Sequence, residues 1–239
     1  MVQYRFSIRF RFFLLLNISL LFSACSSSAS FYPGVVLEDS TSTTAELRII
    51  ALGDAGSFSE TTGSNQQLVA DDLAALAVSH PVDFLLYLGD NFYPTGVQSV
   101  DDPLWATAYT DIYNFSRLPF FYSVAGNHDH YGNALAEVDY SALDSTWIMP
   151  SLSYSFAWIL SDSTRIDFLA IDTTILADPA AAGATKDETE SHWRWIENRL
   201  KAASGGNLIV YGHHAIYSSG THGDNQILID RLQPLPCRS

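Results

Sequence analysis

Cysteine is almost absent from this 239-residue chain, which contains only Cys25 and Cys237, one toward each end. Two cysteines so far apart exclude a disulfide framework and a metal site built from several thiolates. The apolar share of 47% is enough for one sizeable hydrophobic core. The composition is therefore that of a globular protein and not of a disordered one.

Positive charge is also scarce, because 12 Lys and Arg residues stand against 26 Asp and Glu, a formal net charge of -14. An acidic surface repels phosphate backbones, so we expect no nucleic-acid partner and no binding to anionic membranes through a basic patch. A phosphate ester could still bind locally if metal ions supplied the positive charge.

The first 24 residues have the pattern of a secretory leader. Arginines near the start precede an apolar run over residues 12–22, which only Asn17 and Ser19 interrupt. This run is too short to cross a bilayer comfortably and has the length of a signal-peptide core. We predict a signal peptide over residues 1–24 and hence an exported protein, secreted or in the periplasm or cell envelope. An uncleaved start-transfer anchor is the alternative.

The end of this leader allows two kinds of cleavage. The sequence FSAC over residues 22–25 resembles a bacterial lipoprotein box, which would make Cys25 the site of a lipid anchor. Ordinary cleavage after Ala24 or Ala29 would leave no lipid. A Ser/Thr-rich segment with Pro33 and Gly34 follows, and we interpret residues 25–44 as a tether. The folded domain is then predicted over residues 45–239.

Strands and helices are predicted to alternate along this domain. Six apolar runs are expected to be strands, at residues 46–54, 83–90, 119–129, 152–160, 165–172 and 207–214. Two helices are expected: residues 65–80, burying Leu68, Leu73, Leu76 and Ala77, and residues 188–204, burying Trp193, Ile196, Leu200 and Ala203, with Thr189 as its cap and Gly205 at its end. Alternation of this kind predicts an α/β fold.

Four of the predicted strands are followed immediately by side chains that can bind metals. They are Asp54 in GDAG, Asp90 and Tyr93 in GDNFY, Asn127 and His128 in GNHD, and His213 in VYGH. Each follows a glycine, which permits a tight turn at the strand end. Taken singly, each residue is more ordinarily a turn, cap or core residue. Their joint occurrence at strand carboxyl ends, where α/β folds place their sites, is what indicates function.

The chemistry of this set points to metals. Carboxylates, a carboxamide oxygen, a phenolate and an imidazole form a mixed ligand set that suits Fe, Mn or Zn. A carboxylate that bridges two ions, with separate ligands on either side, describes a two-metal hydrolase.

These motifs resemble those of the calcineurin-like metallophosphoesterases, and within them the purple acid phosphatases of the small tartrate-resistant type. Gly56 stands where other branches have histidine, and Tyr93 follows Asp90 by three residues. The resemblance covers residues 45–235. It implies a β-sandwich flanked by helices, in α-β-β-α layers, within the α/β class.

The resemblance also implies a binuclear metal centre of Fe(III) and a divalent ion, which would be Fe, Zn or Mn. Asp54 and Tyr93 would bind the ferric ion, Asp90 would bridge both ions, and Asn127 and His213 would bind the divalent one. His128 and His222 would lie beside the phosphate as substrate contacts or as the proton donor. His214 has no implied role and is interpreted as structural, whereas Asp129 and Asp172 are interpreted as supporting or turn residues.

The implied activity is that of an acid phosphatase, in which a hydroxide bridging the metals attacks the phosphorus of a small phosphate monoester. Two alternatives stay open: a phosphodiesterase or nucleotide hydrolase of the same superfamily, and an inactive pseudo-phosphatase. The sequence leaves the oligomeric state open.

One motif of the family has no counterpart here. The resemblance implies a GHxH motif beyond His213 that gives one histidine to each metal, yet none of the 26 residues after His213 forms it. Pro236 would also end the amphipathic helix that precedes it. We therefore expect a C-terminally truncated chain without its last strands, as a fragment, a frameshifted product or a degenerate copy. Substitution by His214 or His222 is the alternative.

Overall fold

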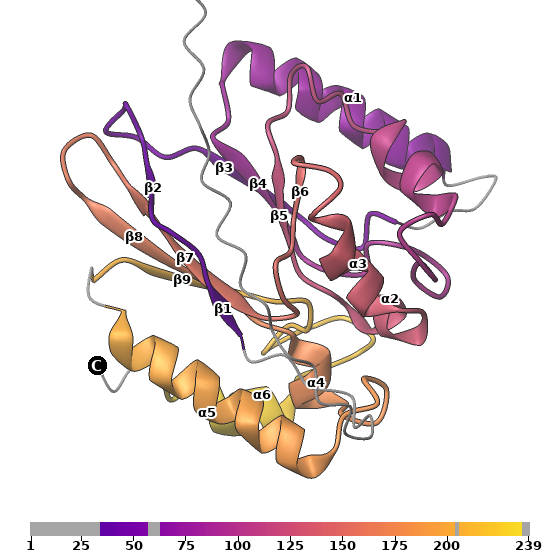
Figure 1. Ribbon diagram of the computed structural model, residues 1–239, viewed down its shortest axis with the longest axis vertical. Coiled ribbons are helices and arrows are strands. Elements are labelled where there is room, and N and C mark those ends of the chain that lie inside the picture. The colour runs from indigo at the N-terminus through magenta and orange to yellow at the C-terminus, as the bar shows by residue number, and fades with distance from the viewer. Residues whose placement is uncertain (1–33, 57–62, 204–205, 236–239) are drawn as a thin grey trace, which may run out of the picture. The chain divides into compact units, whose positions relative to one another are not determined.

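The computed structural model describes residues 34–56, 63–203 and 206–235. The predicted signal peptide over residues 1–24, the candidate lipid site Cys25, and Gly205 and Pro236 lie outside the described residues. Within them, two β-sheets face each other, and helices cover the outer face of each sheet (Figure 1). The predicted α/β class with helix, sheet, sheet and helix layers is confirmed.

The first sheet is entirely parallel. It consists of β3 (Ile49–Leu52), β4 (Phe84–Tyr87), β5 (Phe121–Ser123) and β6 (Trp147–Ile148), in that order. Helix α1 (Gly63–Ser79) connects β3 to β4 and lies over its outer face (Figure 1). Every residue of β4 is buried, as expected for a central parallel strand that is covered on both faces.

The second sheet is mixed. Strand β7 (Tyr154–Ile159) pairs in parallel with β1 (Val35–Val36) and β2 (Ser40–Thr41), and runs antiparallel to β8 (Arg165–Ala170), which in turn pairs in parallel with β9 (Leu208–Tyr211). Helices α5 (Lys186–Ala202) and α6 (Gln226–Arg231) cover its outer face through an apolar cluster that includes Leu169 of β8.

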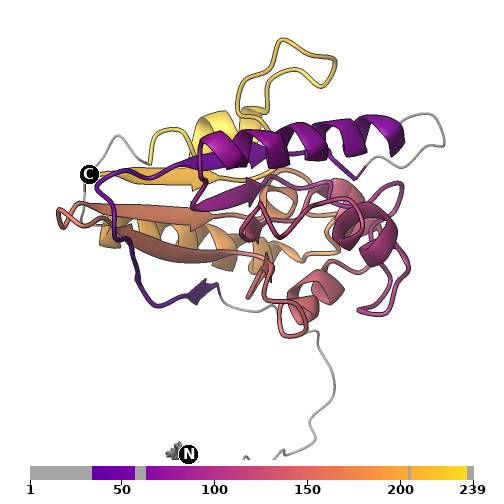
Figure 2. The same cartoon turned by 90° about the horizontal axis from the view of Figure 1, so that it is seen from above.

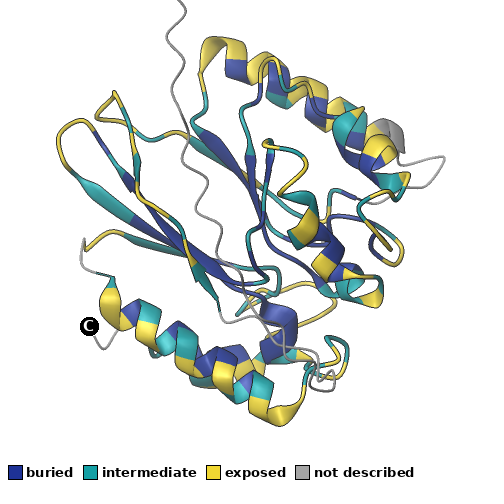
Figure 3. Ribbon diagram, viewed as in Figure 1, coloured by how far each residue is buried: buried dark blue, intermediate teal, exposed yellow. Residues whose placement is uncertain are grey.

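The core between the sheets is aromatic. Phe84 of β4 contacts Phe156 of β7 and Phe168 of β8, with ring centroids 5.9 and 5.4 Å apart, and the two second-sheet rings stack at 4.7 Å. Burial of one such ring contributes about 1.5–3 kcal/mol. Figure 3 shows that the buried residues concentrate between the sheets and beneath the helices.

All six predicted strands are observed, but the sheet begins earlier than predicted. Strands β1 and β2 lie within the segment that was interpreted as a tether, and Val35 pairs with Tyr154. The boundary near Ala45 was wrong because these short strands have a Ser/Thr-rich neighbourhood and form only by adding to an existing edge. Strand β6 was missed because a strand of two residues carries no periodic signal.

The buried face of α1 was predicted only in part: Ala77 is buried and Leu73 packs against the core, as expected. The helix buries Ala70, Ala74 and Ala77, whereas Leu68 is 61% and Leu76 is 46% exposed. The small side chains let the helix approach the sheet closely. Apolar residues lie on more than one face of this helix, so periodicity alone could not identify the buried face.

The cap of helix α5 is Thr185, four residues before the predicted cap Thr189. The Thr185 hydroxyl accepts a hydrogen bond from the Glu188 backbone N–H, and the Glu188 carboxylate accepts one from the Thr185 N–H at 2.7 Å. This reciprocal pair satisfies two free N–H groups at the helix start. Thr189 instead lies buried inside the helix. The predicted buried stripe of Trp193, Ile196 and Leu200 is confirmed.

Shorter helical segments surround the ends of the strands: α2 (Asn127–Tyr131), α3 (Ala134–Tyr140), α4 (Thr173–Ala177) and a π-helical turn at Ala106–Thr110. The segment between β9 and α6, residues 212–225, projects beyond the sheets (Figure 2). Among the helices of the described residues, none has the length and apolar character needed to cross a bilayer.

Candidate metal centre

A cavity of about 430 Å³ lies at the carboxyl ends of β3, β4, β5 and β9. All seven residues predicted for the site line it: Asp54, Asp90, Tyr93, Asn127, His128, His213 and His222. The first three strands run parallel, so their carboxyl ends meet at one edge, and β9 brings its own end to the same place. The structure thus brings the predicted residues together, while their individual roles stay predictions.

Tight turns aim the two aspartates into the cavity. Asp54 and Asp90 have φ values of 55° and 52°, in the left-handed region that non-glycine residues seldom occupy. Gly89 also has a positive φ, and a Cβ there would lie 2.7 Å from the His213 Cβ. The expectation that a glycine permits the turn therefore holds after β4, where Gly89 has a positive φ. After β3 the residue with the positive φ is Asp54 itself.

Tyr93 lies between the two carboxylates. Its hydroxyl is 2.6 Å from Asp90 Oδ2 and 3.1 Å from Asp54 Oδ1. Burial, and next the hydrogen bond to Asp90 and the charges of both carboxylates, raise the pKa of Tyr93. A phenol has one proton and can donate to only one of these oxygens at a time. One proton cannot balance the negative charge of both carboxylates. A cation among the three groups would compensate the remaining negative charge.

His213 presents a free lone pair to the cavity. Its Nδ1 lies 3.1 Å from the Leu88 carbonyl oxygen, which can only accept, so Nδ1 carries the hydrogen. In the neutral ring Nε2 is then an acceptor, yet it lies 3.2 Å from Asn127 Oδ1 and 3.4 Å from Asp90 Oδ1. A backbone carbonyl that orients the ring in this way is the usual arrangement behind a metal-binding histidine.

Asn127 turns its oxygen toward the same point. Its amide nitrogen lies 3.4 Å from the Tyr131 hydroxyl, which leaves Oδ1 facing His213. Suitable atoms of Asp54, Asp90 and His213 all lie within 4.8 Å of one another. Acceptor atoms this close repel unless a cation lies among them. The residues therefore fit a metal centre of mixed oxygen and nitrogen ligands.

His128 is held beside this group. Its backbone N–H donates to Asp90 Oδ1 at 2.9 Å, and its Nδ1 lies 2.6 Å from the Pro94 carbonyl oxygen. Since that carbonyl only accepts, Nδ1 carries a hydrogen, and the free Nε2 lies 4.0 Å from Asp90 Oδ2. His128 thus faces the cavity with a single available ring nitrogen.

His222 reaches the cavity from the projecting segment between β9 and α6. Its side chain is exposed and makes no hydrogen bond or ion pair to any described residue. The structure therefore places it at the mouth of the cavity, less firmly held than His128 and His213.

Buried carboxylates support the turn that carries Asp90. Asp129 accepts hydrogen bonds from the backbone N–H groups of Asn91, Phe92 and Gly126 at 2.8–3.1 Å. Burial raises its pKa to about 6, although these hydrogen bonds oppose the increase. Glu137, also buried, accepts from the Asn91 side chain, and burial followed by the charge of Asp129 raises its pKa. Sequence patterns gave no indication of Glu137.

A second buried group connects the two sheets beneath the site. His130 Nε2 lies 2.7 Å from Asp172 Oδ2, and the Asp172 backbone N–H donates to the Ser153 hydroxyl. The adjacent Thr173 hydroxyl accepts from the backbone N–H groups of His213 and His214. The supporting role interpreted for Asp172 agrees with this position, but His130 and Thr173 were missed. Thr173 directly follows the predicted strand over residues 165–172, which is the one signal that could have found it.

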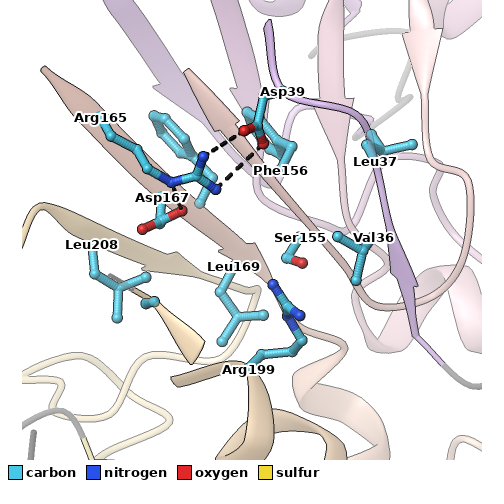
Figure 4. A pocket seen from close by; sticks show the side chains of 12 residues that line it. Val36, Leu37, Asp39, Ser155, Phe156, Arg165, Asp167, Leu169, Arg199 and Leu208 are labelled. Carbon is cyan, nitrogen blue, oxygen red and sulfur yellow. Dashed lines mark hydrogen bonds and ion pairs between the residues drawn. The ribbon is translucent and has the colours of Figure 1, made fainter. Parts of the chain in front are cut away.

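A much smaller cavity, of about 20 Å³, lies on the outer face of the second sheet (Figure 4). Arg165 beside it forms an ion pair with Asp39 and donates to Asp167 Oδ1 at 2.9 Å. The space suffices for about one water molecule. We therefore interpret this cavity as part of the contact between the N-terminal strands and β8, not as a ligand site.

The model for calcineurin-like phosphoesterases matches residues 47–235, most of the chain. The chain belongs to the calcineurin-like phosphoesterase family. The resemblance inferred from GDAG, GDNFY, GNHD and VYGH is thereby confirmed.

Curated relatives of this calcineurin-like domain carry acid phosphatase names. Tartrate-resistant acid phosphatase type 5 of Mus musculus is 29% identical over 214 residues, which cover 84% of this chain and 65% of the relative. Purple acid phosphatase 7 of Arabidopsis thaliana is 31% identical over 209 residues, covering 79% and 60%. The calcineurin-like chain thus spans less than two thirds of the length of these relatives.

Among solved structures, the fold is similar to GAP50, the anchor in the inner membrane complex of Plasmodium. The TM-score is 0.67 at 28% identity, and the match covers 79% of this chain and 61% of that one.

Proposed function

We propose that the protein hydrolyses phosphate monoesters with two metal ions held at the large cavity. The observation that carries this proposal is the convergence of Asp54, Asp90 and His213 within 4.8 Å in a calcineurin-like domain. Acceptor atoms gathered in a cavity whose described lining has no lysine or arginine need cations. A phosphate monoester, which is a dianion near neutral pH, is a suitable ligand for a pair of cations. The names of the relatives support this class of substrate.

We assign the ligands as follows. Asp54 and Tyr93 would hold a ferric ion, Asp90 would bridge, and Asn127 and His213 would hold a divalent Fe, Zn or Mn ion. When bound, the two ions would neutralise charge on the phosphoryl group and lower the pKa of water. The position of Asp90 supports the bridging role, since Oδ2 faces Tyr93 and Oδ1 faces His213.

His128 and His222 are proposed to act on the substrate. Nδ1 of His128 already donates to Pro94, so Nε2 can give a proton to a leaving oxygen only when the ring is cationic. His222, at the mouth of the cavity, would contact the phosphate or the leaving group from the opposite loop.

The test measures hydrolysis by the chain loaded with iron and zinc. We expect p-nitrophenyl phosphate to be hydrolysed, and the variant Asp90→Asn to lose at least about 100-fold in kcat/KM. Asp101→Asn, at an exposed position outside the cavity, is the matched control and should retain wild-type activity. A loaded chain that holds two metals and hydrolyses no phosphate ester would contradict the proposal.

Two alternatives have specific support. Phosphodiester or nucleotide hydrolysis would use the same ligands, and faster turnover of bis(p-nitrophenyl) phosphate than of the monoester would establish it. An inactive binding protein is supported by the similarity to GAP50, which is named an anchor. Failure of the chain to bind iron or zinc would favour that alternative.

We also propose that the protein is exported through residues 1–24 and carries a lipid at Cys25. Cell fractionation and intact mass test both. Export with a lipidated Cys25 should place the protein in the membrane fraction with an added acyl mass, and Cys25→Ala should release it. An intact mass that includes residues 1–24 would contradict cleavage.

A further inference from the structure

His214 lines the large cavity together with Asp90 and His128, and the proposed reaction gives it no role. It directly follows His213, but the two rings diverge, with centroids 5.0 Å apart and planes at 79°. The ring of His214 therefore has its own orientation and does not share the metal-facing position of its neighbour.

The orientation of this ring is set by Thr173. The Thr173 Oγ1 lies 2.8 Å from the His214 backbone nitrogen, 3.2 Å from the His213 backbone nitrogen and 3.0 Å from His214 Nδ1. A hydroxyl oxygen has two lone pairs and one hydrogen. The two backbone N–H groups use both lone pairs, so the hydroxyl hydrogen points to Nδ1.

This geometry determines the tautomer. Nδ1 of His214 accepts from Thr173, so in the neutral ring the hydrogen is on Nε2. Nε2 lies on the other side of the ring from Thr173, and it makes no hydrogen bond to any described residue. His214 thus has a fixed N–H donor with no partner among the residues that the structure describes.

The cavity needs such donors. Three of its lining residues are aspartates, namely Asp54, Asp90 and Asp224, and among the described residues that line it there is no lysine or arginine. A phosphate ester bound there would therefore obtain hydrogen bonds chiefly from histidine, serine, asparagine and backbone N–H groups, in addition to the cations. A neutral donor meets a phosphate oxygen without needing a proton from solvent.

We propose that His214 binds substrate by donating a hydrogen bond from Nε2 to a non-bridging phosphate oxygen. The inference rests on the proposed function, because it takes a phosphate ester as the occupant of the cavity. It replaces the interpretation of His214 as a purely structural residue: Thr173 holds Nδ1 so that Nε2 is presented to the ligand.

Two substitutions separate binding from structure. Asn at this position can accept the Thr173 hydrogen in place of Nδ1 but has no group at Nε2. Gln reaches the position of Nε2 with an N–H donor. The probe is inorganic phosphate, titrated by calorimetry into the full chain loaded with iron and zinc, with metal content measured for each variant.

We expect His214→Asn to keep its metal and to raise the phosphate Kd about tenfold, the value of one hydrogen bond to a charged group. We expect His214→Gln to bind phosphate more tightly than His214→Asn. An unchanged Kd in His214→Asn would overturn the inference, and so would equal loss of metal and phosphate in both variants, which would assign a structural role.

Imidazole ¹⁵N shifts provide a measurement that does not depend on turnover. We expect His214 to have a protonated Nε2 whose resonance moves on addition of phosphate, and a hydrogen on Nδ1 would overturn the inference. A chain that binds phosphate through His214 but hydrolyses no ester would contradict the proposed function and leave this inference standing. A metal-loaded chain that binds no phosphate would overturn both.

Discussion

His130 and Asp172 form a buried ion pair that joins the two sheets under the metal centre. Their side chains are 7% and 0% exposed, and Nε2 lies 2.7 Å from Oδ2. His130 belongs to the helix that begins with Asn127, and Asp172 precedes Thr173, which holds the His213 backbone. The pair therefore helps set the distance between Asn127 and His213, the two proposed ligands of the divalent ion.

Breaking this pair should destabilise the fold strongly. His130→Ala leaves the Asp172 carboxylate buried without its ionic partner, and we expect a loss of about 3–5 kcal/mol in the free energy of unfolding. Urea denaturation at pH 6 measures it. The exposed ion pair between Arg48 and Glu46 is the matched control, because Glu46→Ala should cost less than about 1 kcal/mol. Similar losses in the free energy of unfolding would show that burial does not increase the contribution of the His130–Asp172 pair to stability.

The same pair should make stability depend on pH. Burial would raise the pKa of Asp172, but His130 outweighs burial and lowers it. The contribution of Asp172 is therefore present above its unfolded pKa, about 3.9, and is lost as pH falls below that value. Burial would lower the pKa of His130, but Asp172 raises it. Its contribution is present below about pH 6.5 and is lost as pH rises through the raised pKa.

The buried carboxyl groups of Asp129 and Glu137 also cause the fold to lose stability as pH rises. The pKa of Asp129 is raised to about 6, and burial followed by the charge of Asp129 also raises the pKa of Glu137. Both groups favour the folded state when protonated, so stability falls as pH rises from about 4. We expect the metal-free chain to be most stable at about pH 4 and to lose stability between about pH 4 and 6. Stability that increases steadily up to pH 8 would contradict this account, and Glu137→Gln should reduce the alkaline slope.

Tyr93 should be responsible for visible colour in the iron-loaded chain. Its pKa is raised in the absence of metal, so only a strongly charged cation would convert it to a phenolate ligand. We expect Tyr93→Phe to lose the phenolate-to-iron absorption band while the chain stays folded. Tyr217→Phe is the control, since Tyr217 is 57% exposed and contacts Gln233. An unchanged band in Tyr93→Phe would remove Tyr93 from the ligand set.

The sequence predicted the site more completely than the supports around it. Asp54, Asp90 and His213 each follow an apolar strand and a glycine, so local pattern alone placed them at strand ends. Glu137 and His130 lie in short helices with no such marker, and their partners are 42 to 46 residues away in the chain. Contacts over such separations depend on tertiary packing, which periodicity does not encode.

The same limit explains the errors in the fold. Alanines and leucines of α1 lie on partly different faces of the helix, and only the sheet beneath decides which are buried. Strands of two residues, such as Val35–Val36 and Trp147–Ile148, depend on a neighbouring strand for their existence. Long buried runs such as Phe84–Tyr87 are apolar enough to be recognised without that knowledge.

Gly126 should be difficult to replace, because there is no space for a side chain. Its φ of -102° suits any residue, but a Cβ would lie 2.4 Å from the Asp90 backbone nitrogen and 2.2 Å from Asp90 Oδ1. Gly126→Ala must therefore displace the turn that aims Asp90 into the cavity. We expect loss of metal binding together with a decrease of at least about 2 kcal/mol in the free energy of unfolding.

Gly183 is the matched control, because it has an unfavourable φ but enough space for a side chain. Its φ is +64°, yet no atom of the described residues lies within 4 Å of the position that a Cβ would take. Gly183→Ala should cost about 1 kcal/mol from backbone strain alone and leave metal binding intact. If the two alanine variants bound metal equally well, the turn at Asp90 would be able to relax around an added methyl group. The close contact between Gly126 and Asp90 would then have no part in shaping the site.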